Sequence, residues 1–369
     1  MRFLKWVFGG ALGLLVVGLI GLALAVQYSS PCPPTIGNSS APETMTATSY
    51  YCYGGSDVLH VSELPKPVPT GNEMLVRVQS ASVNPLDWHF MRGSPYVMRL
   101  MSGIGGPDNI RLGRDFSGIV EAVGPEVTAF KVGDAVFGGG DGAFAQYLLR
   151  TEDRAVALKP ASVSHAQAAA TPVAALTALQ ALRDEGGLKA GQRVLINGAS
   201  GGVGTYAVQI AKAMGAHVTG VASARNHQRV LDLGADEMID YRSRDYTQED
   251  ARYDLIVDNV GNHSVFANHD VLAPGGSLVM VAGGYGDWVG PFKGTIGAMI
   301  LQPFVDEDIR SFMAVLKAQD LQVIADMMAT GQLRSQIDAH YALGDIAAAI
   351  DYSESGRARG KIIIDIPQP

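Results

Sequence analysis

Ala199, Gly201 and Gly204 form an Ala-x-Gly-x-x-Gly pattern between two apolar stretches of the chain. The residues before it, 193–197, have the pattern of a buried strand, and those after it carry apolar side chains at helical spacing. Glycine at 201 lets the backbone touch a pyrophosphate, glycine at 204 lets a helix pack on a strand, and the helix N-terminus attracts an anion. The pattern predicts a dinucleotide-binding turn, with an ordinary βα turn as the alternative.

The residues after the next expected strand, 217–222, bear on which dinucleotide would bind. An NAD-binding chain places Asp or Glu there for the ribose hydroxyls, whereas a 2′-phosphate repels a carboxylate and favours Arg. Here Ser223 and Arg225 follow the strand, and no acidic residue occurs before Asp232. We therefore predict NADPH rather than NADH; the alternative is that Arg225 is only a solvated residue at a helix start.

Such a turn needs a sheet and helices to position it. Residues 186–336 contain strand-like runs separated by helix-like segments, which predicts a parallel, doubly wound Rossmann sheet of the α/β class. The expected strands span residues 193–197, 217–222, 237–240, 253–258 and 276–282.

The chain between residues 50 and 160 has a different pattern, with short β-like runs divided by Gly and Pro turns. The clearest runs are 74–83, 117–124 and 143–149. They predict an all-β or barrel-like first domain, joined to the nucleotide domain by helical residues 166–182. A short helix at 344–352 and a strand at 360–365 end the chain.

Length and composition place the chain among two-domain globular proteins. It has 369 residues, of which 47% are hydrophobic and 17% are charged. A net charge of −8 without a cluster of Lys and Arg argues against a nucleic-acid partner. Cys32 and Cys52 supply neither a disulfide framework nor a set of metal ligands, so we expect two unpaired thiols, or one bridge if the chain is exported.

The N-terminal residues contain a long uncharged run. Arg2 and Lys5 precede residues 7–26, which carry no charge, and about 20 apolar residues cross a bilayer as a helix. We expect a single-pass membrane anchor with the lipid bilayer as partner; a cleaved signal peptide is the alternative. Residues 29–47 have the composition of a flexible tether. The positive-inside rule places the folded part outside, but dinucleotides are plentiful in the cytosol, so the side stays open.

A second apolar stretch spans residues 288–305 and is interrupted by Pro291, Lys293 and Pro303. It has the pattern of a packed helix. A lid over the substrate, a dimer contact and a surface facing a membrane are the alternatives.

Several motifs occur in order along the chain: Asn84-Pro-x-Asp87-x-x-x-x-Arg92-Gly93, residues 112–124, 142–147 and 177–182, and the glycine turn. Together they resemble the medium-chain dehydrogenase/reductase superfamily, in its quinone oxidoreductase (zeta-crystallin-like) branch, over about residues 48–366. After an anchor at 1–28 and a tether at 29–47, the resemblance implies a GroES-like catalytic domain at 48–170. It also implies a Rossmann NADP-binding domain at 171–336, a return segment at 337–369 that completes the catalytic domain, and a possible homodimer.

Zinc-dependent members of this superfamily carry Cys where this chain has Asn84, and His where it has Arg114. A zinc site needs thiolate, imidazole or carboxylate ligands, and neither of these two residues supplies one. The four closely spaced cysteines of a structural zinc site are missing as well, and the eight histidines show no ligand spacing. We therefore expect no metal.

The resemblance also implies residues around the dinucleotide. Tyr241 would pack by the adenosine end, Asn259 and Val260 would border the nicotinamide ribose, and Thr177 and Lys361 match further family positions. The expected cofactor contacts are Thr177, Ala199, Ser200, Gly201, Gly202, Val203, Gly204, Ser223, Arg225, Tyr241, Asn259, Val260 and Lys361.

Hydride transfer without a metal suits a conjugated acceptor, because the developing charge spreads over a quinone or an enone and needs only a hydrogen-bond donor. The candidate catalytic groups are Tyr53, Asn84, Asp87 and Tyr96. Asn84 would orient substrate or nicotinamide, a tyrosine would donate a proton, and Asp87 would act in catalysis or hold a loop.

These residues predict a zinc-independent, NADPH-dependent reductase of a small molecule, either a quinone or an α,β-unsaturated carbonyl. One alternative is an NAD(P)-dependent alcohol or aldehyde dehydrogenase. The other is a non-catalytic, NADPH-binding membrane scaffold.

Overall fold

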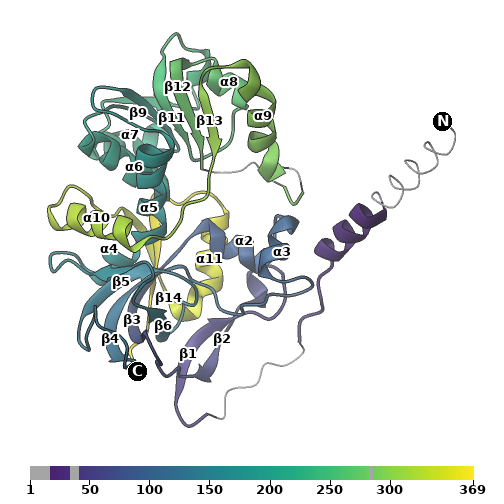
Figure 1. Cartoon of the computed structure of the whole chain (residues 1–369), viewed down its shortest axis with the longest axis vertical. Coiled ribbons are helices and arrows are strands. Elements are labelled where there is room, and N and C mark those ends of the chain that lie inside the picture. Colours follow the sequence, from purple (N-terminus) through teal and green to yellow (C-terminus); the bar gives the residue numbers. More distant parts are fainter. Residues whose placement is uncertain (1–16, 34–40, 282–285, 289) are drawn as a thin grey trace.

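The computed structural model describes residues 17–33, 41–281, 286–288 and 290–369. These residues form two domains stacked one above the other (Figure 1). The upper domain in this view is a parallel sheet flanked by helices, and the lower one is a β-rich domain to which both ends of the described chain return.

The nucleotide domain is built on six strands in the order β10-β9-β8-β11-β12-β13, and all neighbouring pairs are parallel. The five expected strands are present, and β13 is a sixth that the sequence pattern did not predict. The strands are β8 (Arg193–Asn197), β9 (His217–Ala222), β10 (Glu237–Asp240), β11 (Tyr253–Asp258), β12 (Leu272–Met280) and β13 (Asp308–Ser311). The helices are α5 (Pro172–Gln180), α6 (Gly202–Ala213), α7 (His227–Asp232), α8 (Val265–His269), α9 (Lys293–Leu301) and α10 (Ala318–Ala329).

Side chains of β8 show how this sheet acquires two buried faces. Val194 and Ile196 lie in the core that includes α5 and α6, whereas Leu195 lies in a second core with Val265 of α8 and Ala298 of α9. Successive residues of a strand point to opposite faces, so an uninterrupted apolar run is buried on both sides. The continuous apolar strands of the sequence therefore lead to a sheet covered by helices on each face.

The catalytic domain contains a seven-stranded sheet and a separate two-stranded hairpin. The last strand, β15, pairs antiparallel with β3, so the C-terminal residues complete this sheet after the chain has passed through the nucleotide domain. The sheet strands are β3 (Glu73–Val83), β4 (Asp115–Val123), β5 (Ala135–Gly139), β6 (Tyr147–Thr151), β7 (Val156–Leu158), β14 (Ile337–Ala342) and β15 (Lys361–Asp365), and the hairpin is β1 (Thr44–Ser49) with β2 (His60–Pro65). The helices are α2 (Pro85–Arg92), α3 (Arg99–Ser102), α4 (His165–Ala169) and α11 (Ile346–Glu354).

The N-terminal segment, residues 17–33, begins with a helix at 17–27 that projects from the body of the molecule (Figure 1). The described residues include no helix with the length and apolarity needed to cross a membrane. Residues 7–16 of the expected anchor lie outside the described part of the chain. Residues 29–33 run along the catalytic domain instead of forming a free tether, since Ser30 N donates to Gly105 O over 2.6 Å.

The expectation of two unpaired thiols is wrong. Cys32 and Cys52 form a disulfide with Cα atoms 5.1 Å apart. The contact between Ser30 and Gly105 lays the N-terminal segment against the catalytic domain and brings the two cysteines together. Their separation of 20 residues gave no sign of this contact in the sequence.

Candidate active site

The glycine turn lies between the end of β8 and the start of α6. Gly198 has a φ of 79°, a conformation that favours glycine. A Cβ at Gly204 would lie 2.1 Å from the carbonyl oxygen of Gly198, so this position accepts only glycine without a backbone shift. A Cβ at Gly201 would meet only that oxygen, at 3.4 Å, which leaves open space beside the helix N-terminus. Close packing at 204 and open space at 201 are the two features that a bound pyrophosphate requires.

Asn259 lies at the carboxyl end of the neighbouring strand β11 and faces this turn. Its Nδ2 donates to the carbonyl oxygen of Asn197 over 2.9 Å. Its Oδ1 is buried and has no partner among the described residues. Val260 packs beside Gly198, where a Cβ would lie 2.8 Å from Val260 Cγ2. A buried acceptor without a donor is costly, and a hydroxyl or amide of a bound dinucleotide would satisfy it.

Asn226, which the sequence did not single out, organises the region where the 2′-phosphate of NADPH is expected to bind. Asn226 Nδ2 donates to Ser200 Oγ over 3.1 Å and to Ser223 Oγ over 3.2 Å, which links the glycine turn to the end of β9. Arg225 is exposed, and its guanidinium has no hydrogen-bond or ion-pair partner in the described part of the chain. The register pairs Asp240 with Ala222, so Tyr241, which is 54% exposed, leaves β10 at this same edge. The unpaired guanidinium of Arg225 and the exposed ring of Tyr241 are suited to contact a phosphorylated adenosine.

A polar cluster of Asn84, Asp115 and Lys361 lies where the catalytic domain meets the glycine turn. Lys361 Nζ donates to Asn84 Oδ1 over 2.5 Å and to Val83 O over 3.1 Å, and it lies 3.4 Å from Asp115 Oδ2. Asn84 Nδ2 donates to the same Asp115 oxygen over 3.0 Å. All three side chains are at most 3% exposed. The amide of Asn84 is therefore held from both ends, with one of its N–H groups left without an acceptor among the described residues.

Lys361 also connects this cluster to the cofactor turn. A Cβ at Gly202 would lie 3.4 Å from Lys361 Cδ, so the aliphatic part of the lysine packs on the turn while its ammonium group points to Asn84 and Asp115. Burial lowers the pKa of Lys361, and the nearby carboxylates oppose this effect. Thr177, another expected contact, turns its hydroxyl back onto Val173 O at 2.7 Å.

Asp87 is fully enclosed behind Asn84. Its carboxylate accepts from Asn84 N over 2.8 Å and from Gly113 N over 3.1 Å, so it joins the start of α2 to the loop before β4. Burial raises the pKa of Asp87 to about 7, although both backbone hydrogen bonds lower it. The sequence left two roles open for Asp87, catalysis or holding a loop, and these hydrogen bonds match the second.

The raised pKa of Asp87 predicts a pH-dependent stability. Because the folded pKa of about 7 exceeds the ordinary value of 3.8, its contribution is complete below pH 3.8 and is lost as the pH rises through 7. Asp87→Asn removes this titration, so the variant should gain on the wild type by up to about 1.4 kcal/mol per pH unit between pH 5 and 7. Denaturant titrations followed by tryptophan fluorescence at several pH values would measure this difference. A difference that does not change with pH would contradict the assignment.

The tyrosine candidates lie apart from this polar cluster. The hydroxyl of Tyr53 is within 2.9 Å of Ser102 Oγ and donates to Gly103 O over 2.7 Å, and the side chain is only 7% exposed. Tyr96 makes an edge contact with Trp288, with ring centroids 5.0 Å apart. The guanidinium of Arg99 lies over both tyrosine rings, 4.5 Å from one centroid and 4.8 Å from the other. The structure thus places the two tyrosines around Arg99, while Asn84 is with Lys361.

The positions that hold zinc in related enzymes have other partners here. Arg114 Nε pairs with Asp141 Oδ1 over 3.0 Å, and Asn84 is bound within the polar cluster. Among the described residues, no group of three or more His, Cys, Asp or Glu side chains has a geometry that could hold a metal ion.

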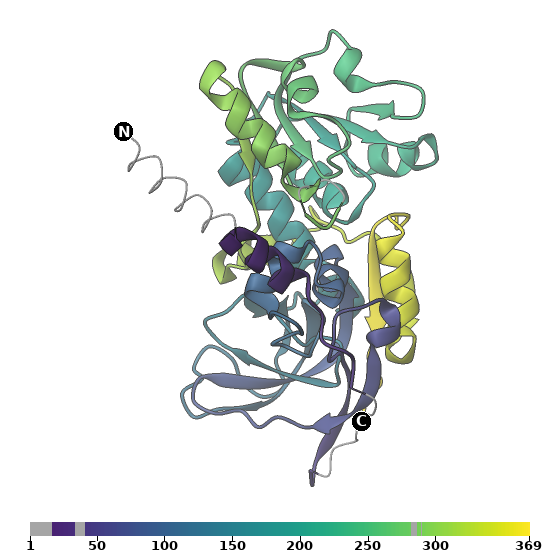
Figure 2. The same ribbon diagram turned by 90° about the vertical axis from the view of Figure 1, so that its right-hand side faces the viewer.

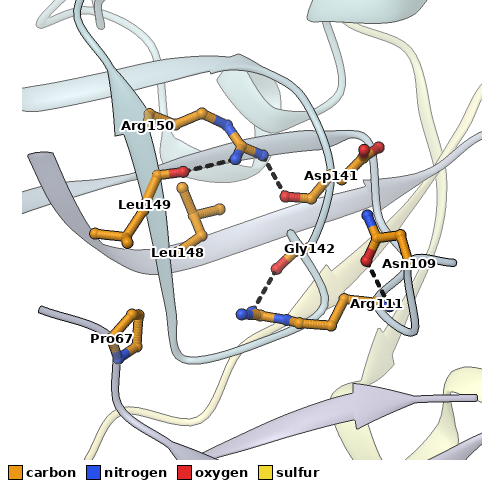
Figure 3. Close-up of a pocket in the computed structure, with 8 residues that line it drawn as sticks. All are labelled: Pro67, Asn109, Arg111, Asp141, Gly142, Leu148, Leu149 and Arg150. Atoms are coloured by element: carbon orange, nitrogen blue, oxygen red, sulfur yellow. Dashed lines mark hydrogen bonds between the residues drawn. The ribbon is translucent and has the colours of Figure 1, made fainter. Parts of the chain in front are cut away.

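A pocket elsewhere on the catalytic domain is lined by Arg111 and Arg150, which bond to the backbone around it (Figure 3). Arg111 Nη2 donates to Gly142 O and to Tyr147 O, each over 3.0 Å. Arg150 donates to Asp141 O over 2.5 Å, and burial lowers its pKa to about 10. The two arginines hold the loop before β6, and none of the expected site residues lines this pocket.

Comparisons with known proteins agree with this architecture. A family model for the alcohol dehydrogenase GroES-like domain matches residues 70–160, and one for zinc-binding dehydrogenases matches residues 233–364. The chloroplast envelope quinone oxidoreductase homolog of Arabidopsis thaliana is 33% identical over 342 residues, which cover 88% of this chain and 99% of that protein. A mitochondrial NAD(P)H oxidoreductase of Homo sapiens is 33% identical over 351 residues, which cover 85% of this chain and 87% of that protein.

Solved structures give the same result. The Escherichia coli quinone oxidoreductase complexed with NADPH superposes with a TM-score of 0.75 and 26% identity, over 87% of this chain and 99% of that chain. The glycine turn, the two-domain fold and the extent of these matches lead to one identification. The chain belongs to the medium-chain dehydrogenase/reductase superfamily, in its quinone oxidoreductase-like branch, and is an NAD(P)H-dependent oxidoreductase.

Proposed function

We propose that this enzyme is a zinc-independent, NADPH-dependent reductase of quinones or α,β-unsaturated carbonyls. The observation that carries the proposal is the Asn84 amide, which Lys361 and Asp115 hold beside the glycine turn. Its remaining N–H group can donate to an oxygen of the acceptor or of the nicotinamide. NADPH supplies the hydride when it is bound.

The fixed amide and lysine favour a conjugated acceptor over a simple aldehyde. Negative charge that develops on a quinone or an enone is spread over several atoms, so a hydrogen-bond donor is sufficient to stabilise it. A simple carbonyl concentrates the same charge on one oxygen, for which related enzymes use a metal ion. Asn84 occupies the position of a zinc ligand in those enzymes and is already bonded to Lys361 and Asp115.

The test is NADPH oxidation by the full-length chain in detergent with a panel of quinones, conjugated enals and enones, and simple aldehydes. The full chain is needed because residues 26–33 bind the catalytic domain through Arg99 and the disulfide. Turnover with conjugated acceptors supports the proposal. Turnover with simple aldehydes alone, or stoichiometric zinc in the purified protein, would reject it, and binding of NADPH without turnover would favour the scaffold alternative.

The preference for NADPH over NADH follows from the residues after β9. Arg225 is exposed and unpaired beside Ser223, at the position where an acidic residue would mark an NAD enzyme. We expect Arg225→Asp to lower the preference for NADPH by about 100-fold, because an attraction of about 1.5–3 kcal/mol to the 2′-phosphate becomes a repulsion. Dissociation constants for both dinucleotides measure the effect, with Arg252→Asp as the control, since Arg252 is exposed before β11, at the end of the sheet opposite the glycine turn. Unchanged relative affinities would refute the assignment.

The membrane anchor and the homodimer remain part of the proposal. The uncharged run at residues 7–26 supports an anchor, and the Arabidopsis relative is named for the chloroplast envelope. The edge strand β13 has a neighbour on one side only, so a second copy could pair with its other side. Extraction of the full chain by alkaline carbonate would argue against the anchor, and a monomeric mass in solution would argue against the dimer.

A further inference from the structure

Apolar side chains are exposed together on one side of the molecule. Leu100, Met101 and Ile104 are 50–88% exposed on the catalytic domain, and Met299, Ile300 and Phe304 are 56–82% exposed on the nucleotide domain. The helix at 17–27 is apolar and exposed as well, and the two views agree that this helix, α3 and α9 share one side of the molecule (Figures 1 and 2). We call residues 17–28, 97–104, 288 and 290–304 the apolar face. Soluble monomers rarely leave so much apolar surface uncovered.

Charged groups are almost absent from the apolar face. Residues 17–28 carry no charge, 97–104 contain only Arg99, and 288–304 contain only Lys293. Arg99 is 4% exposed and is used internally. Lys293 is thus the only exposed charge, and it has the sign that anionic lipid head groups attract.

Arg99 fixes the N-terminal segment to this face. Its Nη1 lies 3.0–3.1 Å from the carbonyl oxygens of Val26, Gln27 and Tyr28, at the end of the helix at 17–27. Helix ends leave such carbonyls without partners, and a guanidinium satisfies them. The disulfide between Cys32 and Cys52 adds a covalent tie a few residues later. The described part of the uncharged run, residues 17–26, therefore leaves the catalytic domain directly from the apolar face.

The apolar face also borders the domain junction that holds the candidate active site. Residues 97–104 follow α2, which starts next to Asn84, and residues 288–304 follow β12, whose carboxyl end lies at the nucleotide side of the junction. The residues at or just before the start of the two parts touch each other: Tyr96 N donates to Asp287 O over 2.8 Å, Ser94 Oγ bonds to the Asp287 carboxylate, and the Tyr96 ring contacts Trp288. The apolar face therefore lies next to the junction of the two domains.

We propose that the apolar face rests on a lipid bilayer and receives a membrane-dissolved acceptor, a quinone or enone with a long hydrocarbon chain. The substrate part of this inference rests on the proposed function. The bilayer is the occupant because the uncharged sequence at 7–26 has bilayer-spanning length and its described end, residues 17–26, belongs to this face, so a membrane that holds the run must lie against its neighbours. The residues of the apolar face include no acidic side chain, and the exposed Asp287 at its border is bonded to Ser94, so the face matches the hydrocarbon and head-group boundary of that membrane.

The first test compares two acceptors with the full-length chain in phosphatidylcholine vesicles that contain some phosphatidylglycerol. Met101→Glu and Phe304→Glu should lower kcat/KM about tenfold for a long-chain quinone dissolved in the vesicles, because a carboxylate resists entering the bilayer. The rate with a short-chain, water-soluble quinone should stay unchanged. Val68→Glu is the matched control, since Val68 is 76% exposed outside the apolar face. Equal effects on both quinones, or no effect on either, would overturn the proposal.

A second test does not depend on activity and separates this proposal from the proposed function. Because the two native cysteines are bonded to each other, a single added cysteine can carry a fluorophore. A label at Met101→Cys should be quenched by spin-labelled lipid in the vesicles, whereas a label at Val68→Cys should not. Quenching without any quinone reduction would retain the membrane face and reject the proposed substrate. Equal quenching at both positions, or loss of a dimer in Met101→Glu with normal use of vesicle quinone, would overturn the membrane face.

Discussion

Replacement of Gly204 with alanine is expected to destabilise the nucleotide domain and to abolish most NADPH binding. The added methyl group would lie 2.1 Å from Gly198 O and 2.8 Å from Ala199 Cα, both of which are backbone atoms. Neither can move without separating α6 from β8, so the cost should reach about 3 kcal/mol, the upper part of the range for overpacked cores. A shift of α6 would also displace its N-terminus from the pyrophosphate.

Two other glycine variants make this prediction specific. Gly201→Ala places its methyl group 3.4 Å from the nearest atom, so it should fold normally but bind NADPH at least about tenfold more weakly, because the methyl group takes up space needed by the pyrophosphate. Gly344→Ala meets no atom within 4 Å and should change neither property. Thermal unfolding and NADPH titrations measure both effects, with a loss of roughly 10 °C expected for Gly204→Ala. A stable Gly204→Ala that binds NADPH normally would refute the assigned role of the turn.

The sequence predicted the nucleotide domain well because its signals are local. Strands β9, β10 and β11 have the predicted bounds. In β9 and β11 all residues but one are buried, which favours a short β-prone run, whereas the edge strand β10 keeps two adjacent apolar residues, Met238 and Ile239. Strand β13 was missed because it lies at the sheet edge, where only Ile309 among its four residues is buried. An edge strand with charged residues on both sides of one apolar residue has no pattern that distinguishes it from a loop.

The polar side of the site was harder to predict because its members are distant in the chain. Lys361 and Asp115 are 246 residues apart and meet only when β15 returns to the catalytic sheet. One signal was available: Asp115 opens an apolar run that forms β4, and a carboxylate in a buried strand needs a partner. The same reasoning applies to Arg99, a lone charge in an apolar segment whose partners are backbone carbonyls of the N-terminal segment.

Lys361→Met is expected to have the largest effect on stability of any single ion-pair variant in this enzyme. The substitution keeps the aliphatic packing on Gly202 but leaves the carboxylate of Asp115, which is 0% exposed, without its cation. Removal of one partner from a buried ion pair costs about 3–5 kcal/mol. It also frees the Asn84 oxygen, so we expect kcat to fall by about 100-fold through misplacement of the amide.

Lys66→Met is the matched control, and it shows why distance alone does not rank ion pairs. Lys66 Nζ lies 2.7 Å from Glu121 Oε1, which is closer than the 3.4 Å between Lys361 Nζ and Asp115 Oδ2. The side chains of Lys66 and Glu121, however, are 20% and 33% exposed. Water screens that pair and solvates the carboxylate left behind, so the loss should not exceed about 1 kcal/mol. Lys361→Met combined with Asp115→Asn should recover much of the lost stability, because the uncompensated charge is then absent, while activity stays low. If the double variant is no more stable than Lys361→Met alone, the cost does not come from the buried charge and the ion pair is not what holds Asn84 in place.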